Sequence, residues 1–314
     1  MDVITIGETM VLFTPESSGP LRYVNSFQKT IGGAESNVCI ALARLGHQTG
    51  WISRLGDDEF GLYIRNYIRG EGVDTSAVNF DKNYPTAVFF KETNIGKDPA
   101  IYYYRGNSAA SRMTNQDLNE AYISQARFIH LTGITPALSL SCREMIYKTI
   151  ELAHKNKQTI TFDPNIRLKL WKREEAKEVL LDIAHKCHIV MPGIEEGELL
   201  TGESSPEKIA MSLLKGETKV VVVKLGDQGA YYATKEESAY VSGENVSQVI
   251  DTVGAGDGFA AGFLSGLIRG WDYQKSVQLG NRIGAHAITV TGDIEGYPYW
   301  SEIDPNNADE NILR

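Results

Sequence analysis

The chain has 314 residues, of which 42% are hydrophobic and 23% charged, and its formal net charge is −9. This length and composition are typical of a soluble globular protein with one large or two small α/β domains. The acidic balance disfavours a nucleic-acid partner, and no apolar run reaches the roughly 18 residues that a membrane span needs. The start MDVITIGETM lacks the features of a signal peptide, and three well-separated cysteines suit a reduced cytoplasm.

Short runs rich in β-branched residues alternate along the chain with helix-length segments. The runs are VITIG, TGWISRLG, ARFIHLTG, QTITFDP, CHIVMPG and TKVVVVKLG, and helices are expected over 139–157, 174–186 and 207–215. Near-continuous apolar runs that end at Gly or Pro are typical of strands buried on both faces. The alternation therefore predicts an α/β fold with a mostly parallel sheet, in which ligands bind beyond the carboxyl ends of the strands.

Two segments depart from this alternation. Residues 86–105, TAVFFKETNIGKDPAIYYYR, predict two strands joined by a turn around 94–97, and residues 11–28 are extended and irregular. The pattern is compatible with a small β flap that stands off the main sheet and equally with an ordinary hairpin at its edge.

Residues 251–266, DTVGAGDGFAAGFLSG, place small residues at the entry to an apolar helix. From Phe259 onward the apolar residues recur every four positions, as on a buried helix face. Gly254, Ala255 and Gly256 would form the turn at the helix start, where free N–H groups and the helix dipole favour an anion. A lone acid such as Asp257 is most simply a helix cap, but a cap does not require the surrounding small residues. The run favours phosphoryl transfer, with Asp257 taking a proton from a hydroxyl.

Other phosphate-binding signatures are absent from the sequence: it contains no G-x-x-x-x-G-K-[ST], and the first strand ends in IGETM rather than G-x-G-x-x-G. DTVGAGDGFAAGF resembles instead the C-terminal signature of the ribokinase-like (PfkB) carbohydrate kinases, and IGGAESNVCIALARLG, residues 31–46, resembles their N-terminal Gly-Gly signature. The resemblance covers essentially the whole chain. It implies that Asp257 is the base and that the backbone of Gly254, Ala255 and Gly256 forms the anion hole.

The same resemblance implies the architecture and the cofactors. The expected fold is a three-layer αβα sandwich, with one kinase domain over residues 1–314 and a β-sheet lid formed by about 11–31 and 85–107. The expected cofactors are ATP and Mg²⁺, with K⁺ as a further candidate. We also expect a homo-oligomer that binds a small-molecule sugar acid and ATP, and neither nucleic acid nor membrane.

VKLGDQGAYY resembles the nucleotide-binding strand and turn of the family, although without the family it would be interpreted as a hairpin turn. MPGIEEGELLTG resembles the N-x-x-E motif that organises Mg²⁺ through water; here Gly193 replaces the Asn, while Glu196 remains. The alternative for Glu196 is a helix-start acid. The nucleotide-binding residues that the family implies are Asn165, Arg167, Lys224, Leu225, Gly226, Asp227, Gly229, Gly254, Gly256 and Asn281.

The sugar site carries two further signals. Many relatives that take neutral sugars have an acid in a G-E-x-x-x-D arrangement, whereas this sequence has Leu12 at the last position, which removes a carboxylate that would repel an acidic substrate. Arg105 and Arg167 follow expected strands, and an Arg fork matches a carboxylate at two points, although an Arg taken alone is most often a solvated surface charge.

The runs YYYRGNSAAS and DPNIR look most like 2-keto-3-deoxygluconate (KDG) kinases, which implies phosphorylation of the 6-hydroxyl. The alternatives are a fructokinase or ribokinase of the same family and, from a different class, a non-catalytic sugar- or nucleotide-binding regulator. The residues implied around the substrate are Gly33, Phe89, Tyr103, Tyr104, Arg105, Arg167, Asp257 and Asp293.

Overall fold

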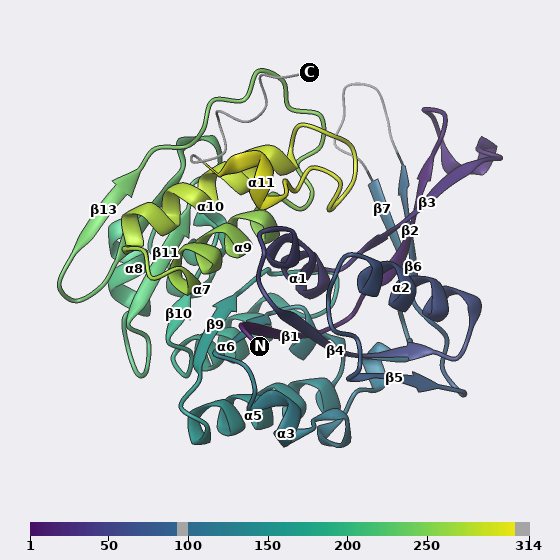
Figure 1. The fold of residues 1–314 in the computed structure, drawn as a ribbon, viewed down its shortest axis with the longest axis horizontal. Helices are drawn as coiled ribbons and strands as arrows, with labels where there is room; N and C mark the ends of the chain where they lie inside the picture. Colours follow the sequence, from purple (N-terminus) through teal and green to yellow (C-terminus); the bar gives the residue numbers. More distant parts are fainter. Residues whose placement is uncertain (93–99, 305–314) are drawn as a thin grey trace.

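A large sheet runs through the centre of the molecule, and helices cover both of its faces (Figure 1). The structure is a computed structural model that describes residues 1–92 and 100–304. In these ranges the sheet has nine strands in the order β13-β12-β11-β10-β9-β8-β1-β4-β5. Their bounds are β1 (Val3–Ile6), β4 (Thr49–Gly56), β5 (Val78–Asp81), β8 (Phe128–Thr132), β9 (Thr159–Asp163), β10 (Ile189–Val190), β11 (Val220–Lys224), β12 (Ala230–Ala233) and β13 (Ser238–Val241).

Pairing is parallel from β11 to β5 and antiparallel only where β12 and β13 extend the sheet. The expected α/β fold with a mostly parallel sheet is confirmed. The continuous apolar run of β11 shows why: Val220 and Val222 pack into the core on one face, while Val221 and Val223 pack into the core on the other. Successive residues of a strand point to opposite faces, so a strand covered on both sides needs apolar residues throughout.

The two helical layers have separate cores. One layer holds α1 (Ala34–Arg44), α2 (Glu59–Gly70), α9 (Ala255–Ile268), α10 (Tyr273–Ala287) and α11 (Trp300–Ile303). The other holds α3 (Glu120–Ile123), α4 (Thr135–Leu138), α5 (Leu140–Lys155), α6 (Arg173–Ala184), α7 (Ile194–Thr201) and α8 (Pro206–Leu213). None of the helices in the described ranges has the length and apolar character that crossing a bilayer requires.

A second, four-stranded sheet projects from the side of the main body (Figure 1). Its strands, in the order β3-β2-β6-β7, are β2 (Met10–Pro15), β3 (Phe27–Gly32), β6 (Val88–Glu92) and β7 (Ala100–Tyr104). We call it the small sheet. It brings together the two segments that departed from the alternation, and it is not an edge of the main sheet. The turn expected around 94–97 lies outside the described residues.

Candidate active site

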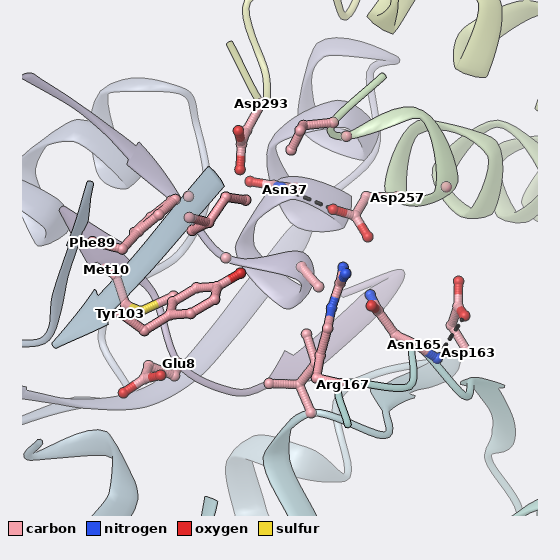
Figure 2. Close-up of a pocket in the computed structure, with 18 of the residues that line it drawn as sticks. Glu8, Met10, Asn37, Phe89, Tyr103, Asp163, Asn165, Arg167, Asp257 and Asp293 are labelled. Carbon is pink, nitrogen blue, oxygen red and sulfur yellow. Dashed lines mark hydrogen bonds between the residues drawn. The ribbon is translucent and has the colours of Figure 1, made fainter. Parts of the chain in front are cut away.

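A cavity of about 320 Å³ opens between the small sheet and the start of α9, at the carboxyl ends of the main-sheet strands (Figure 2). Asp163 at the end of β9 and Lys224 at the end of β11 line it, as does Asp257 in the first turn of α9. Phe89 and Tyr103 line it from the small sheet. Parallel α/β sheets bind their ligands at this edge, so the topology alone marks the cavity as the candidate site.

The turn into α9 requires glycine at one position. Gly254 is the N-cap residue and has φ 81°, in the left-handed region. A Cβ at Gly254 would lie 2.1 Å from the carbonyl oxygen of Asp293. Both the backbone conformation and this close approach therefore exclude a side chain.

The first turn of α9 presents backbone N–H groups. The first i→i−4 bond of the helix runs from the Gly258 N–H to the Gly254 carbonyl, at 2.8 Å. The N–H groups of Ala255, Gly256 and Asp257 precede that bond and have no acceptor within the helix. The start of α9 therefore has the partial positive charge and the donors that an anion needs.

Asp257 is held by a residue from the other end of the chain. The buried Asn37 side chain in α1 donates a hydrogen bond from Nδ2 to Asp257 Oδ2, at 2.8 Å (Figure 2). Burial raises the pKa of Asp257 to about 7; the Asn37 hydrogen bond opposes this rise, and the nearby charge of Asp163 adds to it. A carboxylate that titrates near neutral pH is well matched to general-base work.

Asp293 is a second carboxylate with a pKa raised to about 7, again mainly by burial. Figure 2 shows Asn37 between Asp293 and Asp257. A Cβ at Gly32 would lie 2.6 Å from Asp293 Oδ2, so this glycine of the N-terminal signature leaves room for the carboxylate.

Lys224 supplies positive charge beside the helix start. Its Nζ lies 2.5 Å from Asp163 Oδ2 and would be the nearest atom, at 3.6 Å, to a Cβ on Gly256. Burial lowers the pKa of Lys224, but the carboxylates of Asp163 and Glu196 outweigh burial and raise it, so the ammonium stays charged. The same Asp163 accepts the backbone N–H of Asn165, which has a positive φ of 37° and also lines the cavity.

Glu196 is both a helix-start acid and part of the cavity lining. Its Oε2 accepts the N–H of Gly193, the N-cap residue of α7, at 2.8 Å, and its Oε1 accepts the N–H of Ile166 at 2.7 Å. Two backbone N–H groups thus fix the Glu196 carboxylate, although Gly193 provides no side chain in place of the Asn of the N-x-x-E motif. No group of three or more His, Cys, Asp or Glu residues in the described ranges forms a metal cage. Mg²⁺ usually takes only one or two carboxylates from the protein and keeps several waters, so it does not need a dedicated cage of protein ligands. The two carboxylates of Asp163 and Glu196 therefore fit this ion.

The small sheet contributes stacked rings and a paired cation. Phe89 and Tyr103 stack with ring centroids 5.7 Å apart. Arg105 lines the cavity, but its Nη2 lies 2.6 Å from Oε2 of the buried Glu8. Ser108 also holds Glu8, donating from Oγ to Oε1 at 2.6 Å. The charge of Arg105 is therefore already balanced by a carboxylate of the protein.

Leu12 is buried on the inner face of the small sheet and is not part of the cavity lining. The sequence lacks the acid at position 12, as expected, but Glu8, the acid at the start of the same arrangement, does line the cavity. Leu12 and Glu8 stand four positions apart in the same G-E-x-x-x-D arrangement. The loss at one position therefore leaves the acid at the other.

Most of the residues expected at the site from the sequence meet in this cavity: Gly33, Phe89, Tyr103, Arg105, Asn165, Arg167, Glu196, Lys224, Gly254, Gly256, Asp257 and Asp293. Tyr104 does not. It follows Tyr103 on β7, points to the opposite face of the small sheet and is 66% exposed. Any contact of Tyr104 with the substrate stays a prediction.

Five expected nucleotide-binding residues also lie outside the lining, which contains neither Leu225, Gly226, Asp227 and Gly229 nor Asn281. The first four occupy the antiparallel hairpin turn between β11 and β12. Asn281 is buried in α10, where its Nδ2 donates to the carbonyls of Val241 and Ser242, at 3.2 and 2.9 Å. Any contact of these residues with a nucleotide stays a prediction.

The sequence interpretation missed Glu8, Asn37 and Asp163, which all line the cavity. Each lies inside a motif that it did single out: Glu8 in IGETM, Asn37 in the Gly-Gly signature and Asp163 in FDPNIR. For Asp163, its place at the end of a buried strand was a usable signal. For Asn37 there was none, because its partner lies 220 residues away.

The model of the pfkB family of carbohydrate kinases matches residues 1–300, and the chain belongs to this family. The 2-dehydro-3-deoxygluconokinase of Bacillus subtilis (strain 168) is 42% identical, over 95% of this chain and 93% of its own. The enzyme of the same name from Thermoproteus tenax is 34% identical, over 99% and 94%. Fructokinase-1 of Zea mays is 33% identical, over 96% of each chain.

Solved structures agree with this assignment. A PfkB protein from Polaromonas sp. JS666 superposes with a TM-score of 0.89 and 40% identity, over 97% of this chain and 99% of its own. A ribokinase II from E. coli, in complex with ATP and Mg²⁺, superposes with a TM-score of 0.90 and 28% identity, over 96% and 97%. The ribokinase-like α/β fold expected from the sequence is confirmed, and the protein is a carbohydrate kinase.

Proposed function

We propose that this kinase transfers the γ-phosphoryl group of ATP to the 6-hydroxyl of KDG, which is also called 2-dehydro-3-deoxygluconate. The observation that carries the proposal is the placement of Asp257 at an anion-binding helix start, inside a cavity that also contains Arg105 and Arg167. The names of the relatives from Bacillus subtilis and Thermoproteus tenax support the same substrate.

Asp257 acts as the general base. It takes the proton of the sugar hydroxyl as the oxygen forms its bond to phosphorus and the bond from phosphorus to the ADP oxygen breaks. The N–H groups at the start of α9 and the ammonium of Lys224 stabilise the negative charge on the transferred group. Asn37 orients the carboxylate and keeps its pKa from rising further.

ATP and Mg²⁺ are the cofactors that we propose, supported by the E. coli relative that binds both. Asp163 and Glu196 would hold the ion through water, and Mg²⁺ supplies charge neutralisation of the phosphates. Asn165 and Arg167, beside them, would contact the phosphates. A requirement for K⁺ is tested by replacing K⁺ with Na⁺ in the assay.

Arg167 is the better candidate for the sugar carboxylate. Figure 2 shows its side chain extending into the cavity toward Asp257, and its charge lowers the pKa of that residue. Within the described residues Arg167 makes no ion pair, whereas Arg105 is paired with Glu8. An unpaired guanidinium in a cavity gains more from an incoming carboxylate than a paired one does.

Fructose is the second candidate substrate, favoured by the ion pair of Glu8 with Arg105. A balanced pair offers hydrogen bonds to neutral hydroxyls and no net charge, and a fructokinase is among the relatives. The test is a coupled assay of ADP release with KDG, fructose and ribose at equal concentrations. We expect the highest kcat/KM with KDG; a preference for fructose would reject the sugar acid and keep the kinase.

We further propose that the protein is a cytoplasmic homo-oligomer. All three cysteines are free and buried, which suits a reducing compartment. The outer face of the small sheet carries clustered rings of Phe13, Phe27 and Phe90, next to the exposed Tyr104. Such a face suits self-association, and light scattering of the wild type and of Tyr104→Lys tests this, because the variant should shift toward monomer.

A further inference from the structure

A buried ion pair joins the small sheet to the segment that leads into α9. Lys91 on β6 is 4% exposed, and its ammonium contacts Oδ2 of Asp251, which is 9% exposed. Lys91 lies two residues after Phe89 on the same strand, so both side chains point to the inner face of the small sheet. Burying two charges is unfavourable unless they meet, and the pair therefore fixes β6 against this segment.

Asp251 also contacts the two segments that carry Asp257 and Asp293. Its Oδ1 accepts the N–H of Val253 at 3.3 Å, and Val253 directly precedes the N-cap residue Gly254. Its Oδ2 accepts the N–H of Gly292 at 3.4 Å, and Gly292 directly precedes Asp293. Val253, Gly254 and Asp293 all line the cavity. One carboxylate thus organises the anion-binding turn and the second acid of the site.

We propose that Lys91 and Asp251 form a positioning pair for phosphoryl transfer. The ammonium on the small sheet fixes Asp251, and Asp251 fixes the turn that presents the N–H groups of α9. The pair thereby fixes the position of the small sheet, on the sugar side of the cavity, relative to the start of α9, on the phosphate side. Neither residue lines the cavity, so the pair acts on the reaction only through the residues that it positions.

The test compares kcat and KM in Lys91→Met, Asp251→Asn and the double variant, which retains no buried charge at this place. KDG is the sugar, or fructose should the wild type prefer it, so the result does not depend on the substrate assignment. A misplacement of about 1 Å at a reacting centre can cost about 100-fold in rate, and we expect each variant to lose roughly tenfold in kcat with a smaller change in KM. Because the two residues act as one unit, the double variant should lose no more than the worse single variant.

A purely structural role would leave kcat unchanged in folded protein, so each variant is assayed well below its melting temperature. Lys91→Arg, which keeps the charge, should restore most of the lost rate. Hydrogen exchange of residues 250–254 should speed up in the folded double variant. Lys29→Met is the control, since Lys29 is an exposed lysine on β3 of the same sheet. A folded double variant with kcat within threefold of wild type, additive single losses, or unchanged exchange at 250–254 would each overturn the proposal.

Discussion

The wall of the cavity formed by α9 and the strand ends of the main sheet can be compared with the wall formed by the small sheet. On the first wall, charge comes from backbone N–H groups and from carboxylates such as Glu196, which two backbone donors fix. On the second wall, side chains hold one another: Glu8 holds Arg105, and Tyr103 stacks on Phe89. We infer that the first wall performs the transfer with any sugar, whereas the second wall, together with Arg167 after β9, decides which sugar is accepted.

The largest expected effect is on the first wall, at Asp257. Asp257→Asn keeps the shape and the hydrogen-bonding capacity toward Asn37 but cannot accept a proton, so kcat should fall by about 10³-fold for every sugar. ATP affinity, measured by calorimetry, should stay within a few-fold of wild type. Turnover within tenfold of wild type would falsify the assignment of Asp257 as the base.

Replacing each of the two glycines of the first wall by alanine should change the free energy of unfolding in opposite directions. Gly254→Ala places a Cβ against the Asp293 carbonyl at φ 81°, which should reduce the free energy of unfolding by roughly 1–3 kcal/mol and displace the N–H donors. Gly256 is helical, and Gly256→Ala should stabilise the helix by about 0.5–1 kcal/mol. Its methyl group would nevertheless enter the space before Lys224 and reduce turnover.

Chemical denaturation and kcat, measured on both glycine variants, separate the two roles. Equal losses of stability would mean that position 256 also needs glycine for the backbone. In the sequence both glycines stand in one small-residue run, and nothing there separates their roles. The backbone angles do, because the left-handed conformation belongs to Gly254 and not to Gly256.

On the second wall, Arg105 should discriminate between sugars. Arg105→Ala removes a cation and leaves Glu8 buried without its partner. A charged hydrogen bond contributes about 1.5–3 kcal/mol, so kcat/KM for an acid that contacts Arg105 should fall roughly ten- to over a hundredfold more than for fructose. Glu8→Gln, which frees the guanidinium, should act in the opposite direction and favour KDG. Parallel losses on both sugars in Arg105→Ala would show that the pair only shapes the wall.

The two walls of the cavity also differ in how much of each could be predicted from the sequence. The start of α9 is encoded within a few consecutive residues, and continuous apolar runs indicate the parallel strands. The α/β fold and the turn before Asp257 were therefore predictable from the sequence. The small sheet was only partly predictable, because its strands could be expected but their place off the main sheet was left open. That Glu8 would pair with Arg105 depends on bringing together segments about a hundred residues apart, and no local pattern carries that information. The exposed face of Tyr104 likewise depends on which side of β7 meets the body of the protein.

The pH dependence reports on the first wall. The pKa of Asp257 is raised to about 7, so the base loses its proton only as the pH passes neutrality. The kcat/KM should therefore fall about tenfold for each pH unit below about 7 and level off above it. Asn37→Ala removes a hydrogen bond that lowers this pKa, and the acidic limb should move to higher pH. A limb near pH 4 in the wild type would mean that the base is not desolvated.

The smallest expected effect compares two neighbouring tyrosines of the second wall. Tyr103 lines the cavity, whereas Tyr104 is 66% exposed on the opposite face. Tyr103→Phe keeps the ring stacked on Phe89 and removes only the hydroxyl, and a neutral hydrogen bond of about 0.5–1.5 kcal/mol corresponds to a roughly two- to thirteenfold rise in KM for the sugar. Tyr104→Phe is the matched control and should change KM less than twofold, because its hydroxyl faces away from the substrate. Steady-state kinetics with varied sugar at saturating ATP measure both. An equal rise in the two variants would mean that the hydroxyl groups act through the stability of the small sheet, and the inner face would then lose its role in holding the sugar.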